Sequence, residues 1–242
     1  MERRILSKQL VGILFILVAA QGCERSSTTP LPAPSPTPSP TPEQLVKRTA
    51  ERMSSLSSLR FQLTHKQGRT ALMTGLEAET VDGTVVVPGQ ASLRVEAVAI
   101  ELNMFLEINV AIDGAQSFIT DPLNGQWRGL PAESLPFNFL DLGVNLGKIV
   151  SSMTTPKFTA EKELDGIVVQ GVAGTVSGVD LKPLIPSALA EAQVGLNLWI
   201  DSDGLLRRVH ISGPVIAQDS PDIIRILSFS AFDKPVTITI PK

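Results

Sequence analysis

Alternation between apolar and polar residues dominates the chain beyond residue 58. Leu59, Phe61 and Leu63, for example, are separated by polar residues, which is the period-two pattern of a half-buried β-strand. Short connections containing Gly, Pro, Asn or Asp favour antiparallel pairing, so we expect about ten or eleven strands in one sheet. The further predicted strands lie at residues 76–87, 93–97, 103–112, 116–120, 157–164, 167–176, 194–200, 205–212, 223–232 and 236–240.

Helical spacing of apolar residues appears in three places. The first begins at Glu43, just after a proline, and an acidic residue there suits the positive end of a helix dipole. The second spans residues 136–153, where Gly143 and Gly147 predict a weak or broken helix. The third covers residues 181–192 and is broken by two prolines.

These elements predict an α+β fold in which one face of a long antiparallel sheet is apolar. That face must be covered, and the three helical segments are the available cover. A long antiparallel sheet also curls with its twist, so we expect a strongly curved sheet. A curved sheet under few helices leaves space between the layers, where apolar ligands typically bind.

The apolar strand positions allow two interpretations, a filled core or the lining of a lipid cavity. Bulky aromatic residues are few, with nine Phe, two Trp and no Tyr, and small residues such as Ala97, Ala99 and Gly195 leave room on the strands. This composition favours a cavity. The candidate lining residues are Leu93, Val95, Ala97, Met104, Leu106, Ile108, Val194, Leu196 and Leu198.

The N-terminus has the organisation of an export signal. Basic residues precede an apolar run at residues 10–20, which is too short to span a bilayer. Gly22 then precedes Cys23, the only cysteine, and this resembles the lipobox of bacterial lipoproteins, although Ala20 stands where that motif usually has Leu. We expect residues 1–22 to be removed and Cys23 to be acylated, for example with palmitate. The alternative is an ordinary secretory signal followed by a chance cysteine, and export by the Sec or the Tat route stays open.

A proline-rich segment follows the cysteine. Between residues 28 and 42 proline alternates with Thr, Ser, Ala or Leu, which excludes a helix or a central strand. A polyproline II tether of this length reaches roughly 45 Å at about 3.1 Å per residue. We therefore assign residues 23–42 to a lipidated tether and residues 43–242 to one folded domain.

Charge and residue types limit the function. The net charge of −3 gives no basis for nucleic-acid binding. His65 and His210 stand alone in their strands, so we expect no catalytic or metal site and no cofactor. The segment from Asp201 to Gly204 is similar to the start of a calcium loop but lacks the later ligands, and we expect a hairpin turn there.

Two segments near the C-terminus carry a resemblance to a known family. Residues 199–209 read Trp-Ile-Asp-Ser-Asp-Gly-Leu-Leu-Arg-Arg-Val, and residues 232–238 read Phe-Asp-Lys-Pro-Val-Thr-Ile. With the lipidated cysteine, its low-complexity linker and the helix and strand of residues 44–64, they resemble the LppX/LprG-type (LppX_LprAFG) lipoproteins, whose fold is similar to that of the Lol lipoprotein carriers. The resemblance covers most of residues 43–242. It implies a half-barrel sheet with helices closing a hydrophobic cavity, transfer of lipids or lipidated glycans, and no enzymatic activity.

Two functions follow from these expectations. In the first, a monomer anchored through Cys23 on the extracytoplasmic face of the cell membrane binds a lipid or glycolipid and carries it across the envelope, where a transporter is a further partner. In the second, the chain is an anchored structural or sensory domain with a filled core that binds a protein. An interior volume large enough for a lipid chain distinguishes the two.

Overall fold

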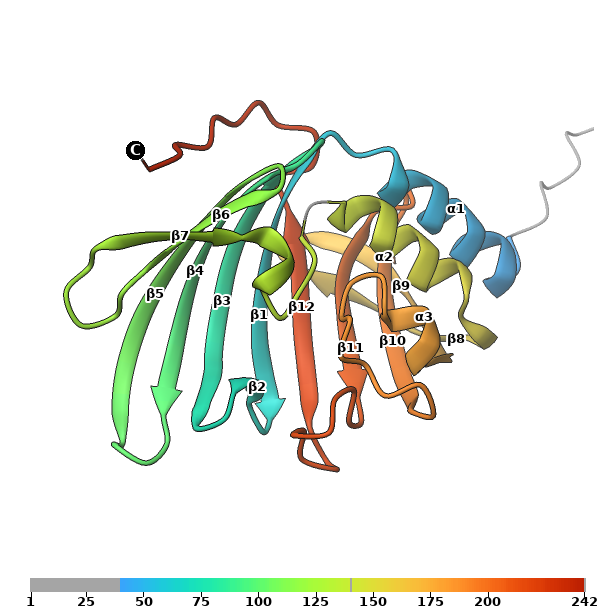
Figure 1. The fold of residues 1–242 in the computed structure, drawn as a ribbon. Coiled ribbons are helices and arrows are strands. Elements are labelled where there is room, and N and C mark those ends of the chain that lie inside the picture. Colours follow the sequence, from blue (N-terminus) through green and yellow to red (C-terminus); the bar gives the residue numbers. More distant parts are fainter. Residues whose placement is uncertain (1–39, 140, 242) are drawn as a thin grey trace, which may run out of the picture. The chain divides into compact units, whose positions relative to one another are not determined.

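The protein, represented by a computed structural model, forms one large antiparallel sheet partly covered by helices (Figure 1). The structure describes residues 40–139 and 141–241. The sheet has twelve strands in the order β7-β6-β5-β4-β3-β1-β12-β11-β10-β9-β8, and the short β2 pairs with β3. The strands are β1 (Ser58–Gln67), β2 (Thr70–Met73), β3 (Leu76–Val86), β4 (Gln90–Ala99), β5 (Met104–Asp113), β6 (Gln116–Thr120), β7 (Trp127–Pro131), β8 (Thr154–Leu164), β9 (Ile167–Ser177), β10 (Gln193–Asp201), β11 (Leu206–Ser212) and β12 (Ile224–Ser230).

Two consecutive meanders make this sheet. The strands from β1 to β7 follow one another along the chain, as do those from β8 to β12, and β1 pairs antiparallel with β12 to join them. The first and last strands therefore lie side by side in the middle of the sheet, with Phe61 opposite Phe229. This confirms the expected antiparallel curved sheet, with β2 and β7 in addition to the predicted strands.

The predicted final strand at residues 236–240 was wrong. Residues 235–241 are irregular, although Ile238 is buried. A strand needs a free edge to pair with, and β1 and β11 already occupy both edges of β12. The alternation there reflects a C-terminal tail that buries Ile238 against the domain but does not pair with any strand.

The two faces of the sheet differ sharply. Along β1, Leu59 and Phe61 are buried on the inner face, whereas Arg60 and Gln62 are exposed on the outer face. This is the division expected of an antiparallel sheet with one covered face.

Helix α1 (Pro42–Ser54) begins where the sequence predicts it. Thr41 and Gln44 form a reciprocal capping box: the backbone N–H of Thr41 donates to Gln44 Oε1 (2.9 Å), and that of Gln44 donates to Thr41 Oγ1 (3.3 Å). The helix buries Leu45, Val46 and Met53 among other residues. Because the cap fixes its first turn, α1 starts immediately after the tether.

Helix α2 (Leu142–Ser151) is shorter than predicted, and its glycines have a different role. A Cβ atom at Gly143 would lie 2.7 Å from the carbonyl oxygen of Met53, and one at Gly147 would lie 2.6 Å from that of Ala50. The glycines therefore let α2 pack directly against the backbone of α1. Residues 136–139 are irregular because their two phenylalanines pack inward rather than joining the helix.

The third predicted helix was wrong for most of its length. Helix α3 (Gly178–Leu181) is a single turn and ends where that prediction began, and the residues after it form turns. Pro183 and Pro186 explain this, since neither can donate a helical hydrogen bond. A short 3-10 helix, η1 (Ala132–Ser134), completes the helical elements of the described residues. In Figure 1 the α-helices lie over the half of the sheet from β12 to β8.

Candidate functional site

Two small apolar cavities lie between the inner face of the sheet and its cover. The first chamber has a volume of about 90 Å³ and lies over β1, β3, β11 and β12. The second chamber, of about 60 Å³, lies between α2 and strands β10, β11 and β12. The chambers are adjacent, because six residues line both: Leu184, Ile185, Ile211, Val215, Arg225 and Leu227.

The first chamber is closed largely by irregular chain. Residues 137–139, 184–185 and 215–216, here named the cover segments, face the sheet across it. Phe139 stacks on Phe61 of β1 with ring centroids 5.7 Å apart. Two of the cover segments are tied to each other by a backbone hydrogen bond from Asn138 N–H to the carbonyl of Leu184 (2.9 Å). None of the cover segments belongs to a helix or a strand.

A larger hollow of about 450 Å³ adjoins the first chamber. It lies between Ile112 of β5 and residues 132–139, and here it is named the mouth. Phe137 and Phe139 line both the mouth and the first chamber. These two rings are therefore the partition between the mouth and the apolar interior.

The chambers are too small, as they stand, for a long acyl chain. Pockets that hold drug-sized ligands have volumes of about 300 to 1,000 Å³, whereas the chambers measure about 90 and 60 Å³. Room for such a chain would need displacement of the cover segments, which border the mouth.

A buried ion pair stands where the chambers meet. Arg225 of β12 is 7% exposed, and its guanidinium Nη2 pairs with the buried carboxylate of Asp219. Its Nε donates to Thr70 Oγ1 (2.7 Å). The other carboxylate oxygen of Asp219 accepts from the backbone N–H groups of Val215 (2.7 Å) and Ile216 (3.1 Å). The pair therefore also holds one of the cover segments.

His65 extends this network. Its Nδ1 lies 3.0 Å from the carbonyl oxygen of Glu79, which can only accept, so Nδ1 carries the proton. Its Nε2 then accepts from the hydroxyl of Thr70 at 2.8 Å. Burial lowers the pKa of His65, and the nearby Arg225 acts in the same direction. The network is consistent with a neutral histidine.

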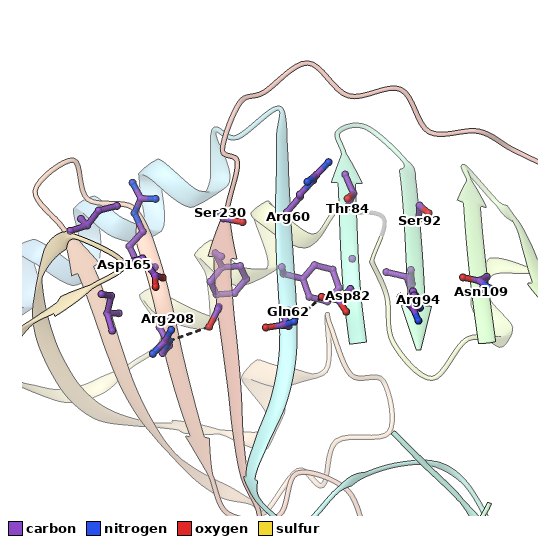
Figure 2. A pocket seen from close by; sticks show the side chains of 18 residues that line it. Arg60, Gln62, Asp82, Thr84, Ser92, Arg94, Asn109, Asp165, Arg208 and Ser230 are labelled. Atoms are coloured by element: carbon purple, nitrogen blue, oxygen red, sulfur yellow. Dashed lines mark hydrogen bonds between the residues drawn. The ribbon is translucent and has the colours of Figure 1, made fainter. Parts of the chain in front are cut away.

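The outer face of the sheet carries a separate groove of about 590 Å³ (Figure 2). Its wall mixes polar side chains with apolar ones such as Leu164 and Ile167. Some of the polar side chains bond to one another: Gln62 donates to Asp82 Oδ1 (2.9 Å), and Arg208 donates to Ser228 Oγ (3.1 Å). Arg94 forms an ion pair with Glu107 (2.7 Å) beside it. This groove therefore differs from the chambers in exposing many polar atoms beside its apolar ones.

Comparison with known proteins gives the family. The family model described as LppX_LprAFG lipoprotein matches residues 41–238. The chain belongs to the LppX_LprAFG lipoprotein family. This confirms the resemblance found in the sequence, and membership of a lipoprotein family implies an envelope-associated protein anchored to a membrane. Comparison with curated protein sequences yields no match.

Solved structures of two mycobacterial lipoproteins share the fold. LprF from Mycobacterium bovis is 20% identical with a TM-score of 0.66, covering 85% of this chain and 99% of LprF. LppX from Mycobacterium tuberculosis is 16% identical with a TM-score of 0.58, covering 82% of this chain and 98% of LppX. A LolA superfamily protein from Nitrosomonas europaea aligns with a TM-score of only 0.30 at 11% identity over 83% of this chain and 96% of its own.

The first C-terminal motif of this LppX_LprAFG protein builds a hairpin turn. Asp201 Oδ1 accepts from the backbone N–H groups of Asp203 (3.0 Å) and Leu205 (2.9 Å), and its Oδ2 pairs with Arg207 (2.6 Å). The expected turn is confirmed, since the carboxylate is used within the loop. No group of three or more potential metal ligands occurs in the part of the chain that the structure describes.

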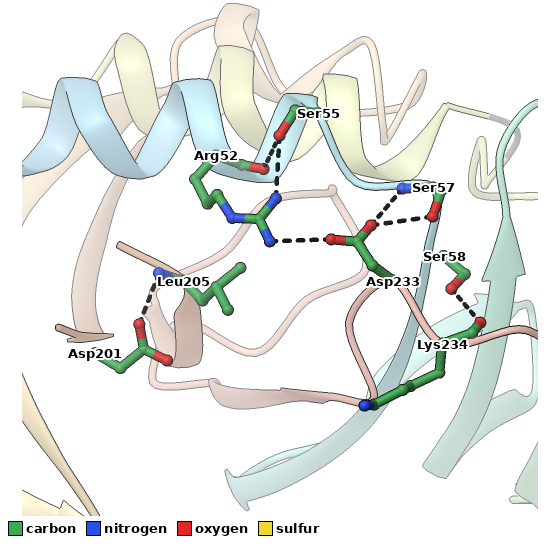
Figure 3. Close-up of polar contacts among 8 residues, drawn as sticks. All are labelled: Arg52, Ser55, Ser57, Ser58, Asp201, Leu205, Asp233 and Lys234. Atoms are coloured by element: carbon green, nitrogen blue, oxygen red, sulfur yellow. Dashed lines mark hydrogen bonds and ion pairs between the residues drawn. The ribbon is translucent and has the colours of Figure 1, made fainter. Parts of the chain in front are cut away.

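The second motif ties the C-terminal tail to the junction of α1 and β1 (Figure 3). The carboxylate of Asp233 pairs with Arg52 (2.9 Å) and accepts from the backbone N–H of Ser57 (2.8 Å). The hydroxyl of Ser58 donates to the carbonyl of Lys234 (2.6 Å). The hydrogen bond from the Ser57 backbone lowers the pKa of Asp233. Both motifs that carry the family resemblance are therefore structural ties.

The candidate cavity residues lie mostly in the core. Of them, Leu196 and Leu198 line the second chamber, and Leu93 borders the outer groove. Met104 is 41% exposed at the start of β5, and Leu106 is half-buried. Their role in lipid binding stays a prediction. The buried candidates are Leu93, Val95, Ala97, Ile108, Val194, Leu196 and Leu198.

Sequence reasoning missed the residues at the centre of the site. Phe137 and Phe139 fell within a predicted helix, and Arg225 was not considered. One signal was available: Arg225 is in phase with Leu227 and Phe229, so it points to the apolar face of β12. A charged residue on a covered face is a reason to look for a site.

The predicted lipidation site lies outside the described residues, since Cys23 precedes residue 40. Within the described ranges, no helix has the length and apolar character needed to cross a membrane.

Proposed function

We propose that this protein is a membrane-anchored lipoprotein that binds the acyl chains of lipids or lipidated glycans between its sheet and its cover segments. It carries them across the cell envelope from a position on the extracytoplasmic face of the membrane. In this proposal residues 1–22 are the signal, acylated Cys23 and the segment up to residue 42 form the anchor and tether, and the rest is the carrier domain.

The observation that carries the proposal is the pair of apolar chambers under an irregular cover. Their walls are almost entirely apolar, and they adjoin the mouth across two aromatic rings, Phe137 and Phe139. Transfer of an acyl chain from water into such an interior is favourable by about 0.8 kcal/mol for each CH₂ group. Displacing the cover segments costs part of this free energy, which suits a carrier that must also release its ligand.

A second candidate function is an anchored protein-interaction domain with a filled core. The small volumes of the chambers favour it, as do exposed apolar side chains at the hairpin tips. Leu102 and Phe105, in the turn between β4 and β5 and at the start of β5, are 70% and 77% exposed. Such tips could contact a protein partner.

Native mass spectrometry separates the two functions. The full-length chain with Cys23→Ser, which removes the acylation site, is purified from a lipid-containing host, and bound molecules are extracted and identified. A near-stoichiometric lipid supports the carrier. A ligand-free mass, together with no uptake of added long-chain lipid, contradicts the carrier and leaves the interaction domain.

A further inference from the structure

One guanidinium nitrogen of Arg225 lacks a hydrogen-bond partner in the part of the chain that the structure describes. Nε donates to Thr70 and Nη2 pairs with Asp219, but Nη1 has no hydrogen-bond acceptor among the described residues, although it is buried. A buried donor without an acceptor costs about 1 to 3 kcal/mol, and more when it is charged. The Arg225 side chain also lines both apolar chambers, but almost no polar atom is exposed in them, so a ligand reaches Nη1 only when the cover segments are displaced.

We propose that Nη1 of Arg225 is a ligand-binding donor that recognises a neutral carbonyl oxygen, such as that of an ester, within the bound lipid. This inference rests on the proposed function and deepens it, because it assigns the polar group that the interior selects. The ligand is an acyl ester, with its carbonyl at Arg225 and its alkyl parts in the chambers.

Charge balance favours a neutral acceptor over an anion. The carboxylate of Asp219 already compensates the guanidinium of Arg225, and burial lowers the pKa of His65 on the same network, which favours its neutral form. A carboxylate or phosphate would add an uncompensated negative charge in a nearly dry space, which is costly. A carbonyl oxygen satisfies the donor without adding charge.

The position of Arg225 favours an acceptor inside a chain over one at its end. Its side chain borders the first chamber under the cover segments and also the second chamber under α2. An ester carbonyl has a substituent on each side, so one arm can extend into each chamber. A terminal carboxylate has only one arm and would leave one chamber unfilled.

The test compares ligands that differ in the acceptor. The full-length Cys23→Ser chain is loaded with the neutral fluorescent dye N-phenyl-1-naphthylamine, which is then displaced with methyl decanoate, undecane or decanoate. We expect methyl decanoate to bind roughly ten- to a hundredfold more tightly than undecane, as for one hydrogen bond to a charged donor. Equal affinities for these two ligands would overturn the inference while leaving the carrier function intact.

Two variants test whether Arg225 causes the preference for the ester over the hydrocarbon. The double variant Arg225→Met with Asp219→Asn removes both charges together and keeps an acceptor for the cover segment, and it should bind the ester and the hydrocarbon equally. Arg60→Met, on the exposed outer face of β1, should retain the preference. A preference that persists in the double variant would overturn the assignment to Arg225.

The remaining outcomes are also decisive. Tighter binding of decanoate than of methyl decanoate would overturn the neutral-acceptor assignment. If no ligand displaces the dye or enters the protein, the proposed function fails and the inference fails with it. If the double variant does not fold, the affinity ratio in the Arg225-containing chain decides alone.

Discussion

The two faces of the sheet are both hollowed, but in opposite ways. The outer groove has a volume of about 590 Å³ and a wall of mixed polar and apolar side chains, whereas the inner chambers measure about 90 and 60 Å³ and are almost entirely apolar. The larger hollow is therefore the less apolar one. The volume of a hollow alone does not indicate which face of the sheet suits an apolar ligand.

Charged residues show the same contrast. On the outer face, Arg94 pairs with Glu107 in water, where such pairs contribute little. On the inner face, Arg225 pairs with Asp219 away from water and lies against two apolar chambers. An inner charge must be paired to be tolerated at all, so the two faces should respond very differently to the same kind of mutation.

The largest expected effect is the loss of the inner ion pair. Asp219→Ala leaves Arg225 buried without its partner and removes the acceptor for two backbone N–H groups, so we expect a loss of about 3 to 5 kcal/mol in the free energy of unfolding. Urea denaturation measures it. The matched outer variant, Arg94→Ala, should change stability very little. Similar losses in both variants would show that the two faces do not differ in this respect.

A smaller effect is expected between the covering helices. Gly147→Ala places a Cβ atom 2.0 Å from Ser54 Oγ and 2.6 Å from the carbonyl oxygen of Ala50, so α1 and α2 must separate. We expect a destabilisation of about 1 to 3 kcal/mol, despite the better helix propensity of alanine. Gly195→Ala is the control, because its nearest neighbour would be 3.7 Å away and stability should hold or rise. A stabilised Gly147→Ala variant would contradict the close packing.

Filling one face at a time tests where ligands enter. Leu184 belongs to a cover segment and lines both chambers, so Leu184→Trp should weaken uptake of N-phenyl-1-naphthylamine about tenfold by occupying the shared space. Thr84→Trp places the same side chain in the outer groove and should leave uptake unchanged. The reverse pattern in a fluorescence titration would move the site to the outer face.

The smallest effect is a dependence of stability on pH. Burial lowers the pKa of His65 in the folded state, so the unfolded chain binds more protons just below the ordinary histidine pKa. Stability should therefore be greatest above about pH 6.5 and should fall as the pH decreases through the folded-state pKa. His65→Gln should flatten this dependence in thermal denaturation between pH 5 and 8. A steeper fall at low pH in that variant would refute the sign.

Sequence reasoning predicted the strands well because alternation is a local property. Each strand carries its own pattern, so β3 to β6 and β8 to β11 lie close to where the alternation placed them. The turn at Asp201 was predictable for the same reason. Local patterns failed where distant parts of the chain determine the structure. At Gly147, for example, the need for glycine comes from the close packing of α2 against the backbone of α1.

The chamber walls could not be predicted in this way. All nine candidates lay on β4, β5 and β10, whereas the first chamber lies over β1, β3, β11 and β12. That location depends on the pairing of Phe61 with Phe229 across the whole chain, which no local pattern records. The sequence thus indicated which residues face inward, and the strand order determined which of them meet the cover.

The pairing of β1 with β12 also affects how the protein is made. Arg60 finds its partner Ser230 only near the end of synthesis, so the first meander must wait with an unpaired edge while the rest of the chain emerges from the ribosome. Contacts this distant along the chain make folding slow. Until β12 is available, the open edge of β1 can pair with strands of other chains, so late pairing exposes the newly made protein to aggregation.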